Sequence, residues 1–540
     1  MKNLQHLFRA CPIDPFLVLL FIFSTIILSL DINSWKYSTL GDDWSLYSYA
    51  VQMLHYGLLN GAYVFGPLRE GVYSVHSPFI SFIQAVGMLI FGENNFGWRM
   101  SGILALTLSI FPVAVICRYF LERRTTYLVV IGVVWSYYLL AESKWGYGWS
   151  LMRLFPLCAV ASLVTFRKSP SIWTAILVAV FTSTSELIGG FGKYVALCTT
   201  VYVIGLIFTK FKGRRIVLFV TFLIVLLATS KVPEYLYGGE SALKELQHSL
   251  WKTSAGPYIA SILGPEWGGK FEETAPAPED FWGAFLRMLV RAMFAPISFR
   301  ANVHLVVGRV VEPLWGLLAV GGMFLSLRLM FVDKRWISMW VFFIPGLVLA
   351  GALTPYRDLA VTRLHFLVPM WGIFAGLAYE KLVPLLIRRK QLINGVTIMY
   401  ACWIVLWSSH SFWVAMPRRY EFGKSQLAMK LIEESPGKNI TFIYDYWHPL
   451  DLVYPHFPNT AQVEILKDPS SEVLVERFQR PNSLLVFPLQ QHLSEREKAI
   501  YRQSLSSLSS GVECVPYRYG EQLLFDFCSK TAIAAPMGSR

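Results

Sequence analysis

Apolar runs long enough to cross a lipid bilayer recur along almost the whole of this 540-residue chain. A helix needs about 17–25 mostly apolar residues to span the roughly 30 Å of hydrocarbon in a membrane. On that criterion we expect about eleven spans, near residues 15–30, 98–119, 126–142, 150–166, 171–188, 193–209, 214–230, 304–330, 336–353, 362–387 and 392–414. The pattern therefore predicts a polytopic α-helical membrane protein.

The composition agrees with this prediction. Hydrophobic residues make up 54% of the chain and charged residues only 15%, whereas ordinary soluble domains carry about 25% charged residues. The deficit of charge extends over most of the length. A disordered chain, a secreted disulfide scaffold and a cytosolic multidomain enzyme are therefore all disfavoured.

The net charge of +13 would by itself suggest a nucleic-acid partner. However, 17 basic residues lie in alternate, short connections between the predicted spans, against only Asp14, Glu122 and Asp333. The basic residues are Lys2, Arg9, Arg118, Arg123, Arg124, Arg167, Lys168, Lys210, Lys212, Arg214, Arg215, Arg328, Lys334, Arg335, Arg388, Arg389 and Lys390. Short loops rich in Lys and Arg stay in the cytoplasm. The basic excess therefore indicates orientation, no nucleic acid is expected, and the chain after the last span lies outside.

Three longer segments fall on the outer side, at 31–97, 231–303 and 418–540. The first contains two amphipathic stretches, 44–59 and 78–91, that we expect to lie as interfacial helices. The second is rich in Gly and Pro and predicts a lid, and its stretch 282–299 is either an interfacial helix or a twelfth span. In the third, apolar strands alternate with helices. We therefore expect a membrane domain over 1–417 and a small extracytoplasmic α/β domain over 418–540.

The seven cysteines have no metal-type spacing. Cys514 and Cys528 both fall in the external segment, so they would pair in an oxidising compartment or remain as two buried thiols.

Acidic residues just outside the first span are the chief candidates for chemistry. Asp42 and Asp43 follow that span by about a dozen residues. Taken alone they are better explained as the cap of a helix than as catalytic groups, because carboxylates there accept backbone N–H groups and interact favourably with the helix dipole.

The layout around this acidic pair resembles a known family. The motifs that carry the resemblance are Asp42-Asp43, Tyr56-Gly57, Val75-His76-Ser77-Pro78-Phe79, the segment 89–99, and Arg363-Leu364-His365-Phe366-Leu367-Val368-Pro369. Over the membrane part, the chain is similar to the GT-C glycosyltransferases, in the branch of the protein O-mannosyltransferases and the lipid A aminoarabinose transferase.

This resemblance implies a transferase that moves a sugar from a polyprenyl-phosphate carrier to an acceptor hydroxyl of a lipid, glycan or protein on the outer face of the membrane. Asp42 matches the family's first acid, the general base of an inverting displacement. Asp43 stands where the family usually has Glu, so either residue could be the base. A carboxylate beside the acceptor oxygen can take its proton as the new bond forms.

The family also has a second acid in the next external loop, and Glu142 is the acid found there. The alternative for Glu142 is an ion pair with Lys144 or another neighbouring basic group. Candidate substrate-binding residues are His76, Lys144, Lys193, Arg357, Arg363 and His365. A phosphodiester requires cationic donors, and Arg363 matches the late motif best, but long basic side chains near a membrane surface also commonly snorkel.

A transporter or flippase of lipid-linked intermediates is the alternative function. Many transporters are built from internal repeats, and we see none here. Some members of the resembled family bind a divalent cation, and their ligand set is not recognisable in this sequence, so metal dependence stays open. We expect a bacterial cytoplasmic (inner) membrane, although the sequon Asn439-Ile440-Thr441 keeps a eukaryotic location open.

Overall fold

The structure is a computed structural model of the whole chain. It describes residues 14–30, 32, 46–47, 50–51, 53–55, 78–144, 148–188, 191–210, 213, 215–237, 281–297, 301–303, 306–308, 310–348, 364–387, 389–415, 435, 437–443, 462–466, 471–488, 513–519 and 522–529.

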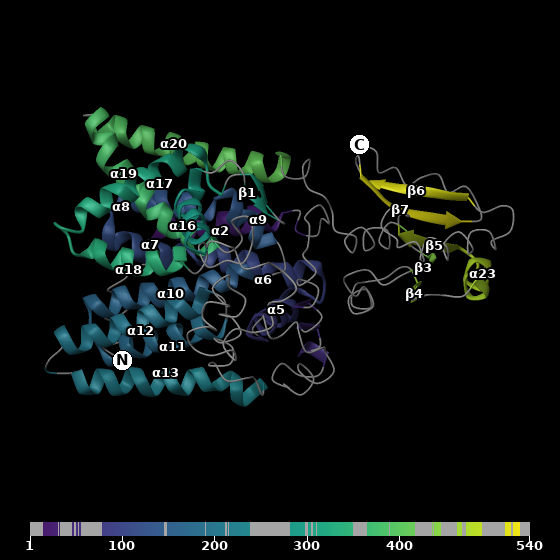
Figure 1. Cartoon of the computed structure of the whole chain (residues 1–540), viewed down its shortest axis with the longest axis horizontal. Coiled ribbons are helices and arrows are strands. Elements are labelled where there is room, and N and C mark those ends of the chain that lie inside the picture. Colours follow the sequence, from purple (N-terminus) through teal and green to yellow (C-terminus); the bar gives the residue numbers. More distant parts are fainter. Residues whose placement is uncertain are drawn as a thin grey trace.

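Long helices dominate the first three quarters of the chain and pack into one bundle (Figure 1). They are α2 (Pro15–Ser29), α5 (Pro78–Phe91), α6 (Asn95–Leu108), α7 (Ile110–Phe120), α8 (Arg123–Val134), α9 (Tyr137–Lys144), α10 (Trp149–Lys168), α11 (Ile172–Leu187), α12 (Phe191–Lys210), α13 (Arg215–Tyr237), α16 (Phe281–Met293), α17 (Pro313–Leu329), α18 (Arg335–Leu347), α19 (Val368–Leu386) and α20 (Lys390–His410). Every span predicted from the sequence coincides with one of these helices or with two consecutive ones. The predicted polytopic helical fold is therefore confirmed.

The number of membrane crossings stays a prediction. Among the described residues, five helices are long and apolar enough to cross a bilayer, or six if the bent pair α8 and α9 counts as one span. Other apolar helices, such as α2 and α11, are shorter than 18 residues. Large apolar side chains are exposed along the outer helices, for example Leu19 on α2, Ile216 on α13 and Leu406 on α20. Such faces suit contact with lipid rather than water.

The predicted span 126–142 is bent where a single straight helix was expected. Helices α8 and α9 meet at an angle of 49°. At the junction, Ser136 Oγ accepts the N–H of Leu139 at 3.3 Å, as an N-cap does. The indole of Trp135 donates to Ser24 Oγ of α2 at 3.0 Å. These side-chain bonds hold the break in place, and α9 is left fully buried with its charged residues inside the protein.

The predicted span 304–330 begins later than expected. A short antiparallel hairpin of β1 (Ala301–Val303) and β2 (Val306–Gly308) precedes it. Helix α17 starts at Pro313, where Glu312 is the N-cap and accepts the N–H of Trp315 at 2.8 Å. Helix α16 contains 13 residues, about 20 Å of helix, which is too short to span and favours the interfacial alternative.

The predicted basic connections lie together at one end of the bundle, here called the basic end. Asp14, the N-cap of α2, binds Arg118 at the end of α7, Arg123 at the start of α8, and Tyr127. Arg335, at the start of α18, donates to the carbonyl of Tyr119 at 2.8 Å. Arg124 likewise binds Asn394 in the first turns of α20. Each of these contacts links two connections that their basic residues assign to the same side of the membrane.

Helices α17 and α19 pack at very short range. A Cβ added at Gly322 of α17 would lie 1.7 Å from the carbonyl oxygen of Phe374 on α19. On α19 itself, Gly376 and Gly372 face Val129 and Val133 of α8 at distances that leave no room for a side chain. Small residues let membrane helices approach closely and gain van der Waals contact. The three helices therefore form a tight unit in the bundle.

The last part of the chain forms a five-stranded mixed sheet with the order β4-β3-β5-β7-β6. Its strands are β3 (Asn439–Ile443), β4 (Gln462–Leu466), β5 (Ser483–Pro488), β6 (Glu513–Tyr519) and β7 (Gln522–Ser529), with α23 (Ser471–Gln479) between β4 and β5. Strands β4, β3 and β5 are parallel, and β7 and β6 are antiparallel additions. Strands and a helix alternate in this part as expected, while the separate domain and its boundary at residue 418 stay predictions because the boundary lies outside the described residues.

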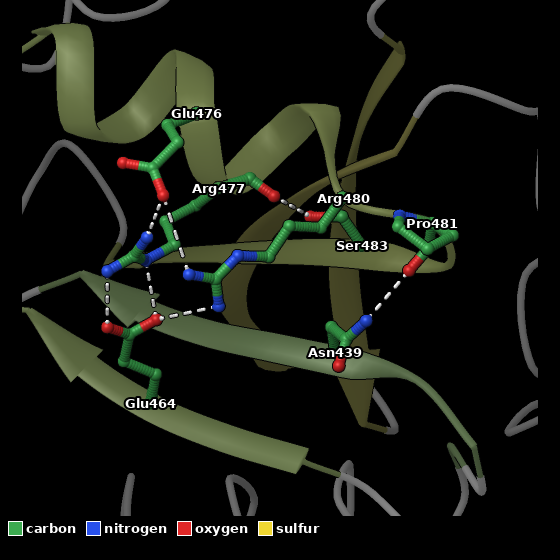
Figure 2. A network of polar contacts seen from close by, with 7 residues as sticks. All are labelled: Asn439, Glu464, Glu476, Arg477, Arg480, Pro481 and Ser483. Carbon is green, nitrogen blue, oxygen red and sulfur yellow. Dashed lines mark hydrogen bonds and ion pairs between the residues drawn. The ribbon is translucent and has the colours of Figure 1, made fainter.

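A polar network fastens α23 to the sheet (Figure 2). Arg477 of α23 and Arg480, the residue that follows the helix, both bind Glu464 on β4, at 2.7 Å and 3.5 Å. Ser483 Oγ of β5 donates to the carbonyl of Arg477 at 2.8 Å. Below these contacts, Leu474 and Phe478 are buried, so the helix packs against the sheet as in other α/β layers.

The two external cysteines occupy directly opposed positions in this sheet. Cys514 on β6 is the register partner of Cys528 on β7. Opposed positions on antiparallel strands bring Cβ atoms to about 4.5–5.5 Å. The backbone therefore allows the predicted pairing, and the alternative of two thiols stays open.

Candidate active site

A buried ion pair occupies the end of the bundle opposite the basic end. Arg153 Nη1 of α10 donates to Glu142 Oε2 of α9 at 2.8 Å, and both side chains are 0% exposed. The turn between α9 and α10 makes this contact possible because it brings residues 142 and 153 side by side. A buried charge without a partner costs several kcal/mol, so this contact offsets part of the cost of burying the two groups.

Two further polar side chains complete the cluster around Glu142. His365, in the single 3-10 turn before α19, places Nδ1 3.8 Å from Glu142 Oε1 and is 1% exposed. Tyr138 lies one turn earlier on α9 and donates its hydroxyl to Glu142. We call Tyr138, Glu142, Arg153 and His365 the buried cluster. Three separate segments of the chain contribute to it.

Lys144 does not pair with Glu142 but ties two other segments to α9. Its Nζ donates to the carbonyl of Leu30 at 2.8 Å and lies 5.2 Å from the ring centres of Phe412 and Trp413. Leu30 is the C-cap of α2, so this bond marks the point where the chain leaves α2 for the segment that carries Asp42 and Asp43. The neighbouring basic group that binds Glu142 is Arg153.

The other described end of that segment lies near the same turn. Ser81 Oγ of α5 donates to the carbonyl of Leu46 at 3.2 Å. The next residue back, Ile80, lies so close to Gly148 that a Cβ there would be 2.4 Å away. Gly148 has a φ of +78°, a conformation that glycine adopts most readily. Leu30 and Leu46 are thus both anchored beside the α9–α10 turn.

The predicted site residues fall into two groups. Glu142 and His365 meet in the buried cluster, and Lys144 is two residues away. Lys193 is half-buried at the start of α12, and its neighbour Tyr194 contacts Phe366 with ring centres 5.5 Å apart. Lys193 is therefore the sequence neighbour of a residue that contacts the segment of His365. Outside the described residues lie Asp42, Asp43, His76, Arg357 and Arg363.

Sequence reasoning missed Arg153, Tyr138 and Arg99. Arg153 and Arg99 are both fully buried, and Arg99 lies over the ring of Trp98, which in turn contacts Tyr47. The available signal was an arginine within an apolar span, because ionisable residues there usually face a protein interior or a functional cavity. For Tyr138 the signal was its spacing of four residues from Glu142, which places both on one helix face.

The chemistry available at this end is that of a carboxylate, a guanidinium, an imidazole and an ammonium group. Among the described residues, no group of three or more His, Cys, Asp or Glu side chains is arranged to hold a metal ion. Cationic donors of this kind bind phosphate oxygens well.

Comparison with solved structures identifies the fold. No family model matches the sequence, and no match to a curated protein is found. The crystal structure of ArnT from Cupriavidus metallidurans bound to undecaprenyl phosphate aligns with a TM-score of 0.53 and 12% identity, covering 95% of this chain and 98% of that one. The apo state of the same protein gives a TM-score of 0.54, with the same identity and coverage. The chain therefore shares the fold of this protein over almost its whole length.

A second solved structure agrees over a similar extent of the chain. The oligosaccharyltransferase of Archaeoglobus fulgidus, in complex with zinc and sulfate, aligns with a TM-score of 0.50 and 11% identity. The alignment covers 94% of this chain and 72% of that one. The fold of this chain is thus that of a multi-pass membrane protein, as the sequence predicts.

Proposed function

We propose that the chain is a glycosyltransferase that moves a sugar from a polyprenyl-phosphate donor to an acceptor hydroxyl. The observation that carries the proposal is the similarity of fold to ArnT with bound undecaprenyl phosphate, which extends over 95% of this chain. The end of the bundle where Glu142, Arg153 and His365 lie is the proposed site.

Covalent geometry supports a location of the acidic pair near this end. A chain of n residues spans at most about 3.6 Å × n. Asp43 is three residues from Leu46, so the two Cα atoms are at most about 11 Å apart. Leu46 is buried and bonded to α5 beside the α9–α10 turn. Asp43 therefore lies within about 11 Å of Leu46, and Asp42 is one residue further, so we propose that this pair serves the surface above the buried cluster.

The proposed reaction is a displacement at the anomeric carbon. Asp42 or Asp43 takes the proton of the acceptor hydroxyl, whose oxygen forms the new bond to the sugar. The bond from the sugar to the carrier phosphate breaks, and the polyprenyl phosphate leaves as an anion. The proposed partners of the donor phosphate are Lys144, Lys193, His365, Arg357 and Arg363. His76, two residues before α5 in the sequence, is proposed to contact the donor phosphate as well.

Glu142 has a proposed second role in the same site. Its carboxylate is bound by Arg153 and faces His365. We propose that Glu142 positions the His365 imidazole, which would then face the donor phosphate. We also propose that the acceptor hydroxyl belongs to a lipid, glycan or protein. The protein would lie in a bacterial inner membrane, with the site and the C-terminus extracytoplasmic.

The proposal is tested with purified full-length protein in lipid nanodiscs, supplied with radiolabelled polyprenyl-phosphate sugars and a crude envelope extract as acceptor. Asp42→Asn and Asp43→Asn are compared with the parent chain. We expect one of them to lower transfer by about 100-fold or more, because general-base catalysis contributes about 10²–10⁴-fold. The matched control is Glu122→Gln, an exposed carboxylate at the basic end, which should retain activity.

Full transfer by both Asp variants, each folded with an unchanged melting temperature, would contradict the catalytic assignment. The alternative of a transporter predicts a different result. Proteoliposomes would then move the labelled lipid across the bilayer with no transfer of sugar to any acceptor and no release of the carrier phosphate.

A further inference from the structure

An apolar cavity lies between five helices and the 3-10 turn that precedes α19. Residues of α7, α10, α12, α18 and α19 line it, among them Ile116, Leu157, Val160, Phe342 and Met370. Its wall is almost entirely hydrocarbon, so the ligand that fits it has a long apolar part.

The polar residues of the wall gather at the basic end. Arg167, at the end of α10, donates to the Tyr202 hydroxyl at 2.5 Å. Its guanidinium lies 5.3 Å from the ring centre of Tyr119, and Lys168 and Arg335 approach the same ring at 5.8 Å and 5.9 Å. Three cations therefore surround one tyrosine at the cavity mouth.

One acid accompanies these cations in the described structure. Asp333 binds Arg335 at 2.7 Å, and the hydrogen bond from Arg335, with a contribution from the charge of Arg167, holds the pKa of Asp333 below its usual range. Asp333 neutralises Arg335, and the charges of Arg167 and Lys168 remain, so the mouth is net positive. It is complementary to an anion.

Tyr119 provides an independent sign of a missing ligand. Its side chain is 8% exposed and lines the cavity. The hydroxyl is buried and has no hydrogen-bond partner among the described residues. A buried hydroxyl without a partner costs about 1–3 kcal/mol, and an acceptor oxygen placed at the mouth would remove this cost.

The length of the cavity indicates how much of a lipid it can hold. From Leu157 to Arg167 the cavity follows ten residues of α10, about 15 Å, which is half of the roughly 30 Å hydrocarbon core. A single acyl chain of one leaflet matches this depth. Arg167 also lies 14 residues from Arg153 of the buried cluster, about 21 Å along the helix, so the mouth is separate from the proposed transfer site.

We propose that this cavity binds one acyl chain of an anionic glycerophospholipid of the leaflet at the basic end, with the lipid phosphate at Tyr119 and Arg167. The phosphate oxygens accept hydrogen bonds from the Tyr119 hydroxyl and the Arg167 guanidinium. The acyl chain fills the space between the five helices. This site would fasten the helices around it from the side opposite the transfer site, and its occupancy does not depend on the proposed activity.

The test uses the full chain, delipidated in detergent and titrated with phosphatidylglycerol, phosphatidylcholine or inorganic phosphate. Native mass spectrometry counts the retained lipid, and thermal unfolding reports stabilisation. We expect one retained phosphatidylglycerol and a raised melting temperature, with little effect of the other two probes. Tyr119→Phe should weaken binding about tenfold, because a hydrogen bond to a charged group contributes about 1.5–3 kcal/mol.

Matched controls separate this site from general attraction of anionic lipids to a basic surface. Lys334→Gln removes an exposed cation at the same end and should leave binding unchanged. Val160→Trp fills the cavity and should abolish retention, whereas Val332→Trp adds the same bulk at an exposed position. Equal retention of phosphatidylcholine, equal stabilisation by inorganic phosphate, or unchanged binding by Tyr119→Phe would overturn the proposal, and the last result does so even if Val160→Trp fails to fold.

Discussion

At the scale of single residues, the buried acids Glu142 and Glu312 of the membrane part both have polar partners. Glu142 and Arg153 share a fully buried contact, and Glu312 accepts from Tyr400 and Trp403. Removal of one member of a buried pair leaves an uncompensated charge, which costs more than removal of both. This asymmetry offers a way to distinguish a structural role from a catalytic one.

Glu142→Gln should destabilise the protein by about 3–5 kcal/mol, because Arg153 then keeps its charge without a counter-ion. The double variant Glu142→Met with Arg153→Met removes both charges and should unfold at a higher temperature than the single variant. Thermal unfolding in detergent measures both effects. If Glu142 takes part in transfer, the stable double variant stays inactive, and a return of activity in it would contradict that role.

Asp14 should make stability depend on pH at the acidic end of the range. Burial alone would raise its pKa, but hydrogen bonds from Tyr127, from the Phe16 amide and from Arg118, with the charge of Arg123, together lower the pKa. A group with a lowered pKa stabilises the fold above its unfolded-state value of about 3.9, and this contribution is lost as the pH falls through the lower folded-state value.

Asp14→Asn keeps a good N-cap residue but removes the charge. We therefore expect the melting temperature of the parent chain to fall more steeply than that of the variant below about pH 4, with parallel curves at neutral pH. Identical slopes across the acidic range would show that Asp14 is not differently protonated in the folded and unfolded states.

At the scale of helices and strands, periodicity and apolar runs located the elements well, and local chemistry decided their ends. The break between α8 and α9 depends on bonds from Trp135 to Ser24 and from Ser136 to the next helix, and the former is a contact between residues 111 positions apart. A single sequence contains no record of such a contact. Similarly, the register that opposes Cys514 and Cys528 follows from strand pairing, not from their spacing of 14 residues.

The contact between α17 and α19 yields a sharp prediction with an internal control. Gly322→Ala places a methyl group where the Phe374 carbonyl already lies, so the helices must separate, at a cost of about 1–3 kcal/mol. Gly321→Ala, one residue earlier, meets nothing within 4 Å and should be neutral or slightly stabilising because Ala favours helices. Equal melting temperatures for the two variants would refute the close packing.

At the scale of the whole molecule, the basic connections and the buried cluster lie at opposite ends of the bundle. Contacts such as Asp14 with Arg118 and Arg335 with Tyr119 join the basic loops, and Lys144 with Leu30 joins segments at the other end. Helix α20 runs from one end to the other, and the sheet follows it (Figure 1). The arrangement agrees with the alternation that the charges predict, while the identity of each side is a prediction.

Sidedness can be measured with cysteines introduced at Asn60 and Gly213 in a chain whose native cysteines are replaced. In intact cells, a membrane-impermeant maleimide should label Asn60→Cys, and it should reach Gly213→Cys, an exposed turn position, only after permeabilisation. Labelling of both from the same side would disprove the proposed topology.

The sequence by itself determined that this chain is a polytopic helical membrane protein and where its apolar segments lie, and it grouped the basic connections, because hydrophobic length and charge placement act locally and need no partner. Only the tertiary structure decided that Glu142 pairs with Arg153 rather than Lys144, that α8 and α9 bend, and that a lipid-sized cavity with a cationic mouth lies near Tyr119. These features depend on contacts between distant residues, and packing in three dimensions selects one partner among several that the sequence allows.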